Sequence, residues 1–282
     1  MIFIMPGSSA VGALTIDALL DLGVAAETIR AGVRSPEKAA LKVPVVRADY
    51  TDPASLRATF EGVKTLALIP TKSPPGQRCV EHENAIAAAA AAGVERVVFL
   101  SIVTHSPESV AAIAPFILFA ESATRTSGMD WAIVRMGLYL EPVADWVPEL
   151  VKMGRLPYPV RQGKAAYVTR EDVARTFAAV CANPALKGEI YNATADPVTM
   201  PELAAAIGAA IGEEIPFEAC SQDEFIELCN MSGEPPFITR VLLSLYRAIE
   251  MGEMNAFTSD VERVTGRPAE TPAHYFQRVL AP

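Results

Sequence analysis

The first forty residues constrain the fold of this chain more than any other segment. An apolar run over residues 1–5 leads into a turn of small residues, and an amphipathic helix follows. A second apolar run spans residues 29–33 and is followed directly by Arg34. Two apolar strands joined by one helix predict a right-handed βαβ unit, in which both strands lie parallel in the same sheet.

The turn after the first strand predicts a ligand as well as a fold. Small residues let the backbone come close to a pyrophosphate, and the N–H groups at the start of the next helix point towards it. The usual glycine fingerprint is incomplete, because Pro6 and Ser9 stand where glycine is typical. A tight turn that binds nothing therefore stays open as an alternative. The residues expected to bind the diphosphate of a dinucleotide are Gly7, Ser8, Ser9, Ala10, Val11 and Gly12.

Arg34 indicates which dinucleotide the turn would bind. Chains that bind NAD carry an acidic residue after the second strand, where it contacts the ribose 2′-hydroxyl. The guanidinium of Arg34 favours a 2′-phosphate instead, so the sequence predicts NADP(H) as the cofactor; the alternative is a solvated surface arginine. Ligands of such sheets bind at the carboxyl ends of the strands. Two later strand ends are therefore expected to complete the cofactor site, one at Ile69 with Pro70 and one at Ser101.

Strands and helices alternate through the remainder of the first half. Its apolar runs are typical of parallel strands that are buried on both faces. Residues 1–140 are therefore predicted to form an α/β domain, a Rossmann-type doubly wound parallel sheet that binds NAD(P). Further strands are expected over residues 43–46, 65–69, 97–101 and 131–135, with helices over 53–60 and 109–127 and an alanine-rich helix that Gly93 closes.

The second half of the chain loses this rhythm, because prolines interrupt it. We expect residues 141–282 to form a smaller, mostly helical α/β cap over the carboxyl ends of the strands, with some elements returning to the sheet. Helices are expected over residues 170–182, 201–211, 223–229, 236–250, 259–264 and 272–280, and a strand over 189–192. Its large side chains are expected mainly in the core, with some facing a flat apolar substrate: Met136, Trp146, Phe225, Phe237 and Tyr246.

Composition excludes several classes of function. The net charge of −9 argues against a nucleic-acid surface, because phosphate contacts need clustered lysines and arginines. No basic region precedes an apolar run, so we expect no signal peptide, and no apolar run is long enough to span a bilayer. Four scattered cysteines are typical of reduced thiols, and three distant histidines do not have metal-ligand spacing. We therefore expect a cytoplasmic protein without a metal and with a small apolar partner; a monomer and a homodimer both stay open.

Several segments together resemble the NmrA-like branch of the atypical short-chain dehydrogenases, of the triphenylmethane reductase and quinone reductase type. The resemblance implies that residues 33–39 select NADP. It also implies that Asp49 and Tyr50 belong to a turn beside the adenine; the alternative for Asp49 is to cap the helix that starts near Pro53. The parts of the chain that carry the resemblance are Glu121 and residues 33–39, 48–56, 85–94, 98–101, 127–131, 133–135, 170–174, 202–204, 257–262 and 265–267.

The chain departs from the catalytic pattern of short-chain dehydrogenases. Many of these enzymes use Tyr-x-x-x-Lys, in which the lysine lowers the pKa of the tyrosine. Counted from Glu121, the equivalent positions hold Ile113 and Ile117, and neither side chain can carry a proton. Tyr139, after the sixth strand, and His105, after the fifth, are the remaining candidates for a catalytic proton donor.

Two charged groups near these positions are expected to be structural. Glu121 has the spacing to pair with Arg125 on one helix face. Arg135, at the end of the sixth strand, is expected to order the pocket through hydrogen bonds rather than to perform chemistry.

The resemblance implies an NADPH-dependent reductase that transfers hydride to an apolar aromatic or quinone-like substrate. The missing Tyr-x-x-x-Lys pair leaves open a non-catalytic regulator that binds NADP(H) and senses redox state through a partner. The altered turn at Pro6 and Ser9 leaves open a third alternative, a protein that binds a metabolite without any cofactor.

Overall fold

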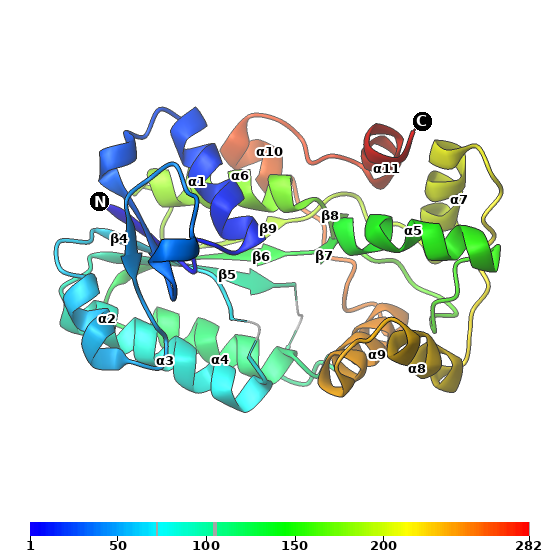
Figure 1. The fold of residues 1–282 in the computed structure, drawn as a ribbon, viewed down its shortest axis with the longest axis horizontal. Helices are drawn as coiled ribbons and strands as arrows, with labels where there is room; N and C mark the ends of the chain where they lie inside the picture. The colour runs from blue at the N-terminus through cyan, green and yellow to red at the C-terminus, as the bar shows by residue number, and fades with distance from the viewer. Residues whose placement is uncertain (72, 104–105, 282) are drawn as a thin grey trace.

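A computed structural model describes residues 1–71, 73–103 and 106–281, and its centre is a parallel sheet (Figure 1). Within this part of the chain seven strands pair in the order β3-β2-β1-β4-β5-β6-β9, and every neighbouring pair is parallel. The predicted doubly wound α/β fold is confirmed. The strands are β1 (Ile2–Met5), β2 (Ile29–Val33), β3 (Val45–Arg47), β4 (Thr65–Leu68), β5 (Arg96–Ile102), β6 (Asp130–Met136) and β9 (Ile190–Ala193).

Helices cover both faces of the sheet, as Figure 1 shows. One apolar core joins one face of the sheet to α1 (Ala10–Asp21), α6 (Arg170–Ala182) and α10 (Asp260–Thr265). A second core joins the opposite face to α2 (Pro53–Thr59), α3 (Pro75–Ala91) and α4 (Ala114–Arg125). Strands buried between two helical layers need apolar side chains on both faces, which explains the continuous apolar runs in the sequence.

The order of the strands creates a switch point at the N-terminal turn. β1 has β2 on one side and β4 on the other. The chain first adds β2 and β3 on one side of β1, and it then adds β4 and the later strands on the other side. In open α/β sheets the crevice at such a point, outside the carboxyl ends of the strands, is where ligands bind. The turn of residues 6–9 lies at this point, between β1 and α1.

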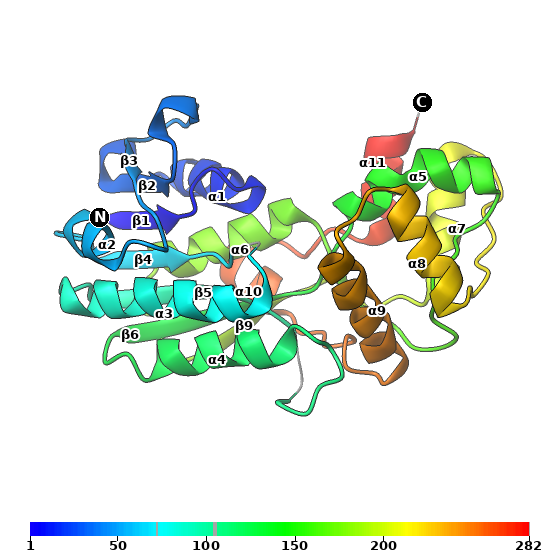
Figure 2. The same ribbon diagram turned by 60° about the horizontal axis from the view of Figure 1, so that its bottom comes forward.

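A third apolar core lies beyond the carboxyl ends of the strands (Figure 2). It is built mainly by residues that follow Met136, and these elements form what we call the cap. Three later elements, α6, β9 and α10, pack with the sheet instead. The cap consists of β7 (Leu138–Tyr139), α5 (Glu141–Met153), β8 (Tyr167–Val168), α7 (Met200–Ile211), α8 (Gln222–Met231), α9 (Pro236–Glu250) and α11 (Pro272–Leu280).

Two local predictions need correction. The helix expected over residues 109–127 is shorter, because α4 begins at Ala114. Its expected first residues bind the cap instead: the Ser109 hydroxyl donates to Glu253, and the Ala112 N–H donates to the Ser244 hydroxyl at 2.9 Å. In the described part of the chain, none of the helices combines the length and the apolar character needed to cross a membrane.

The second correction concerns the start of α2. The N-cap is Asp52, whose carboxylate accepts from the Ser55 N–H at 3.1 Å, and not Asp49. Asp49 accepts hydrogen bonds from the backbone and the hydroxyl of Thr51, at 2.9 and 2.8 Å. The carboxylate three residues before Ser55 has the spacing of a helix cap, whereas Asp49 stabilises the turn before it.

Candidate functional site

Two glycines bring the N-terminal turn into close contact with its neighbours. A Cβ on Gly7 would lie 2.7 Å from the Cβ of Ala31, and the Gly7 N–H donates to the Gly32 carbonyl at 2.9 Å. A Cβ on Gly12 would lie 2.3 Å from the carbonyl oxygen of Pro6. Any side chain at these positions would push the turn away from β2 or α1 away from the turn. The glycines therefore set the tight strand-to-helix geometry that dinucleotide sites use.

Ser9 caps helix α1 with its side chain. Its hydroxyl accepts from the Gly12 N–H at 3.0 Å and donates to the Pro6 carbonyl at 3.0 Å. The hydroxyl is thus used inside the turn. Ser8 and Ala10 are exposed beside it.

The first turn of α1 offers N–H donors that the protein does not use. Within the described residues the N–H groups of Ala10 and Val11 donate to no protein acceptor. Unpaired N–H groups and the positive end of the helix dipole suit an anion. The turn of residues 7–12 therefore fits a diphosphate, although Pro6 contributes no donor.

Positive charge gathers at the ends of β2 and β3. Arg34 is exposed directly after β2, and Val33 pairs with Arg47 of β3 in the register of the sheet. Hydrogen bonds from Thr51 lower the pKa of Asp49, and the charges of Arg34 and Arg47 lower it further. The structure thus brings Arg34, Arg47 and Asp49 together. Arg47 has no distinctive motif around it, and only the pairing of the strands reveals it.

Tyr50 joins the ends of two strands. Its hydroxyl lies 2.9 Å from the Met5 carbonyl oxygen and 3.0 Å from that of Ile69. The Ile69 N–H also donates to Met5, at 2.8 Å. Burial raises the pKa of Tyr50 well above its usual value, so the phenol stays protonated. Tyr50 and the buried Ile69 therefore form the wall beneath the turn, with the half-buried Pro70 at its edge.

A buried polar cluster follows this wall and carries no recognisable motif. The carboxylate of Glu81 accepts from the hydroxyls of Thr71, at 2.5 Å, and Ser73, at 2.8 Å. His82 is fully buried, and its Nε2 accepts from the Thr71 N–H at 3.4 Å. Burial and the nearby charge of Arg78 lower the pKa of His82 to about 3. The neutral imidazole of His82 and the carboxylate of Glu81 thus fix the start of the loop after β4 through their hydrogen bonds with Thr71 and Ser73.

Ser101 lies in a second buried network, away from the turn. Its side chain is fully buried and donates to Glu121 at 2.6 Å. Glu121 also accepts from Arg125 at 2.8 Å and from Arg135 at 2.8 and 2.7 Å. The expected pairing of Glu121 with Arg125 is confirmed. The network joins β5, β6 and α4, and within it the Ser101 hydroxyl donates its proton to Glu121.

Ile117 of α4 and Ile113, the N-cap residue of this helix, are both surrounded by apolar side chains. Ile117 is buried in the core of the cap, and Ile113 packs against that core. His105, one candidate proton donor, lies outside the described residues. Tyr139, the other, lies in β7, where it is half-buried. The guanidinium carbon of Arg170 lies 5.2 Å from the centre of its ring.

The ring of Tyr139 also lines an aromatic cavity in the cap. The cavity measures about 430 Å³. The ring of Tyr158 is stacked on Trp146, with centroids 5.7 Å apart, and its centroid is 4.8 Å from that of Tyr246. The described lining residues include two carboxylates, Asp145 and Glu234, and among them there is no Lys, Arg or His. The cavity therefore suits a flat apolar molecule. The remaining lining residues are Leu138, Pro142, Val143, Tyr167, Phe225, Leu228, Cys229, Ser232, Leu242 and Leu245.

Sequence reasoning found only part of this lining. Trp146, Phe225 and Tyr246 were expected as cap aromatics, whereas Tyr158 and Tyr167 lie in segments without a local pattern. Their positions follow from tertiary packing of segments far apart in the sequence. Among the described residues no group of three His, Cys, Asp or Glu side chains could hold a metal ion.

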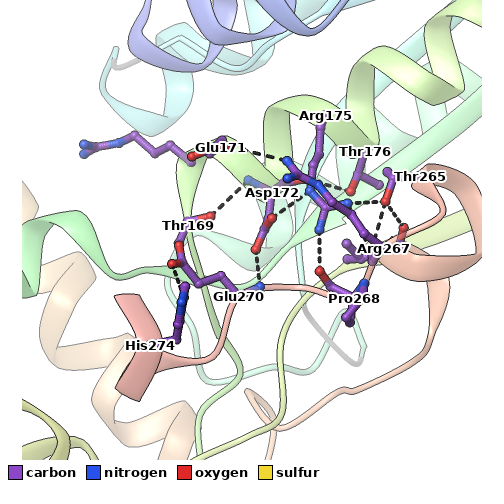
Figure 3. A network of polar contacts seen from close by, with 12 residues as sticks. Thr169, Glu171, Asp172, Arg175, Thr176, Thr265, Arg267, Pro268, Glu270 and His274 are labelled. Carbon is purple, nitrogen blue, oxygen red and sulfur yellow. Dashed lines mark hydrogen bonds and ion pairs between the residues drawn. The ribbon is translucent and has the colours of Figure 1, made fainter. Parts of the chain in front are cut away.

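A polar network joins α6 to the segment that leads into α11 of the cap (Figure 3). Asp172 accepts from the Arg175 Nε at 2.7 Å and from the Glu270 N–H at 2.6 Å. Arg175 donates to the carbonyls of Pro268 at 2.7 Å and Arg267 at 3.1 Å, and to the hydroxyl of Thr265. The segment between α10 and α11 is thereby held on α6, whose first residue is Arg170.

Comparisons with known proteins agree with this geometry. A family model described as NAD(P)H-binding matches residues 7–184. Quinone oxidoreductase 2 from Escherichia coli (strain K12) is 29% identical over 285 residues, which cover 98% of this chain and 99% of that protein.

Two solved structures are similar over the whole chain. The NADPH-dependent quinone oxidoreductase from Escherichia coli, in complex with NADPH, has 28% identity and a TM-score of 0.92, covering 99% of each chain. The Citrobacter sp. triphenylmethane reductase, in complex with NADP(H), has 26% identity and a TM-score of 0.92, covering 99% of this chain and 100% of that one. The resemblance to the NmrA-like reductases is confirmed, and the chain belongs to the NAD(P)H-binding family.

Proposed function

We propose that the protein is an NADPH-dependent reductase that transfers hydride to an apolar aromatic or quinone-like molecule. The observation that carries this proposal is the aromatic cavity at Tyr139. This residue follows β6, so it lies at the carboxyl end of the sheet, as does the turn of residues 7–12 that would hold the diphosphate. The relatives named as quinone oxidoreductase and triphenylmethane reductase support the same class of reaction.

The cofactor would lie along the carboxyl ends of β1, β2 and β4. The turn of residues 7–12 would hold the diphosphate, and Arg34 with Arg47 would bind the 2′-phosphate. Asp49 and Tyr50 would bound the adenine side, and Ile69 with Pro70 would form the wall beneath. Bound NADPH supplies a hydride from its nicotinamide ring.

The cap residues would orient the substrate and supply a proton. Stacked rings favour a flat aromatic substrate, and an apolar lining excludes water from the transfer. Tyr139 carries one of the phenols that line this cavity and is the proton donor of the proposal. Its pKa is raised by burial, so the donor is protonated at neutral pH.

A specific observation favours a second candidate, a regulator that binds NADP(H) without turnover. Ile117, at a position that carries a proton-transfer group in many short-chain dehydrogenases, is buried among apolar side chains. A sensor, however, does not need an aromatic cavity. The alternative without any cofactor does not agree with membership of an NAD(P)H-binding family.

One experiment separates these functions. NADPH and NADH are titrated by calorimetry, and the absorbance of the reduced nicotinamide is then followed with a panel of quinones. Tight binding of NADPH with turnover supports the reductase. Binding without turnover on the whole panel would favour the regulator, and absence of binding would refute both.

A further inference from the structure

We propose that Arg170 is the cation that supports Tyr139 as a proton donor, in place of the lysine of the missing Tyr-x-x-x-Lys pair. The inference rests on the proposed reductase function, because it assigns a role within that reaction. Arg170 is a positioning residue here, since it acts through the phenol. It comes from a different element from the lysine of the usual motif, so no local spacing reveals it.

The two-stranded sheet of the cap brings these residues together. β7 and β8 are parallel, and Tyr139 pairs with Val168. The Leu140 N–H donates to the Val168 carbonyl at 3.1 Å, and α6 starts two residues later at Arg170. The Arg170 N–H donates to a Glu141 carboxylate oxygen at 2.7 Å. These backbone contacts place the start of α6 beside β7, and the guanidinium carbon of Arg170 lies over the ring of Tyr139, 5.2 Å from its centre.

Two charged side chains act on the phenol of Tyr139, and their effects on its pKa are opposite. Burial raises the pKa of Tyr139, the charge of Arg170 lowers it, and Glu141 raises it. The second oxygen of Glu141 is buried and has no hydrogen-bond partner in the described part of the chain. Asp145, also from α5, lines the same cavity with the phenols of Tyr158, Tyr167 and Tyr246. Among the described residues that line the cavity none is a cation, and the positive charge that lowers the pKa of Tyr139 is that of Arg170.

The proton transfer makes the need for this charge clear. The O–H bond of Tyr139 breaks, its proton forms a new O–H bond with the reduced substrate oxygen, and the electron pair stays on the phenolate. The reductase reaction supplies the hydride, and water later returns a proton to the phenolate. In a cavity of low dielectric, an unpaired phenolate would be costly, and a nearby guanidinium stabilises it.

The test measures the phenol itself in the absence of cofactor and substrate. A difluorotyrosine, whose phenol ionises at lower pH than that of tyrosine, is placed at position 139 in the full chain. Its ¹⁹F signal is then titrated against pH. Arg170→Gln should raise the pKa of this phenol by about one unit, a tenfold change in its dissociation constant. Arg170→Lys, which keeps the charge, should restore most of the shift.

Two control variants separate this effect from a general loss of structure. Glu141→Gln keeps an acceptor for the Arg170 N–H and should move the pKa in the opposite direction, downwards. Arg263→Gln removes another arginine that lies over a tyrosine, 5.0 Å from the ring centre of Tyr191, and should leave position 139 unchanged.

An unchanged pKa in Arg170→Gln, or the same rise in Arg263→Gln, would overturn the inference. If Arg170→Gln does not fold, Arg170→Lys and Glu141→Gln decide the question: a pKa that rises by about one unit in Arg170→Lys, or one that does not fall in Glu141→Gln, overturns the proposal. Failure of the reductase function is recognised separately, because the wild-type protein would then reduce no quinone while the titration still reports on the pair.

Discussion

Gly12 and Pro6 touch across the turn that follows β1, since a Cβ on Gly12 would lie 2.3 Å from the Pro6 carbonyl oxygen. The same Cβ would lie 2.9 Å from the Gly7 carbonyl oxygen and from the Ser9 hydroxyl. Two of these neighbours are backbone atoms, which cannot move away without shifting the turn. Helix α1 and the turn therefore form one rigid unit, and this unit is where the diphosphate is proposed to bind.

Gly12→Ala should consequently damage both stability and cofactor binding. Overpacking of this kind costs about 1–3 kcal/mol in the free energy of unfolding. We expect a lower Tm by calorimetry and a weaker NADPH affinity by titration. Gly76→Ala is the control, because a Cβ there would meet nothing within 4 Å and α3 favours alanine. Unchanged NADPH affinity in Gly12→Ala would place the diphosphate elsewhere.

Arg34→Ala should reduce the preference for NADPH over NADH. A hydrogen bond to a charged group contributes about 1.5–3 kcal/mol, so the ratio of the two dissociation constants should fall by about one to two orders of magnitude. Arg47→Ala should act in the same direction. Calorimetric titration with both nucleotides measures the ratio. Arg57→Ala, an exposed change on α2, should leave it as it was; if Arg34→Ala does too, Arg34 does not contact the 2′-phosphate.

His82 should make the protein sensitive to mild acid. The pKa of its buried imidazole is lowered to about 3 in the folded chain, against about 6.5 in an unfolded chain. Between these values the unfolded state binds a proton that the folded state does not, so stability is lost as pH falls below about 6.5. The loss is at most about 1.4 kcal/mol per pH unit.

Urea unfolding at pH 7.5 and pH 5 measures this loss. His82→Phe should make the stability less dependent on pH in this range, even if the variant is less stable at both values. His274→Gln, which changes an exposed histidine, should keep the wild-type dependence. Equal dependence in wild type and His82→Phe would show that His82 does not remain neutral in the folded protein.

Arg175 should be essential for holding the cap on the sheet. Removal of one partner from a buried ion pair costs about 3–5 kcal/mol, because the other charge is left uncompensated. Arg175→Met should therefore lower the free energy of unfolding strongly. Asp172→Asn should lower the free energy of unfolding less in the Arg175→Met variant than in the wild type, since the ion pair is already broken there. Strict additivity of the two changes would contradict a direct coupling.

The sequence was sufficient where structure follows local chemistry. Fully apolar runs predicted the central strands, and Gly93 closes α3 with a positive φ of 78° as expected. The sequence was insufficient where contacts between distant segments determine the structure. Helix α4 starts late because Ser109 and Ala112 bind residues of α9 and the segment after it, more than 130 positions away in the chain.

The candidate site shows the same division. The turn at residues 7–12 and Arg34 lie in one continuous βαβ unit, so the spacing of the residues revealed them. The neighbours of Tyr139 come from β7, α5, α8, α9 and the start of α6. No periodicity in the sequence brings Arg170 next to Tyr139, because their contact depends on the pairing of β7 with β8.

Tyr139→Phe removes the phenol while it keeps the ring under Arg170, and it should therefore slow turnover without weakening the cofactor complex. General acid catalysis contributes about 10²–10⁴-fold, so kcat for a quinone should fall within that range while the dissociation constant of NADPH stays constant. Stopped-flow absorbance of the reduced nicotinamide measures the first quantity, and calorimetry measures the second. Tyr275→Phe, which changes a tyrosine outside the lining of the cavity, should retain the wild-type kcat. A Tyr139→Phe variant with full activity would mean that the proton reaches the substrate from another group, and the pairing with Arg170 would then have no role in the reaction.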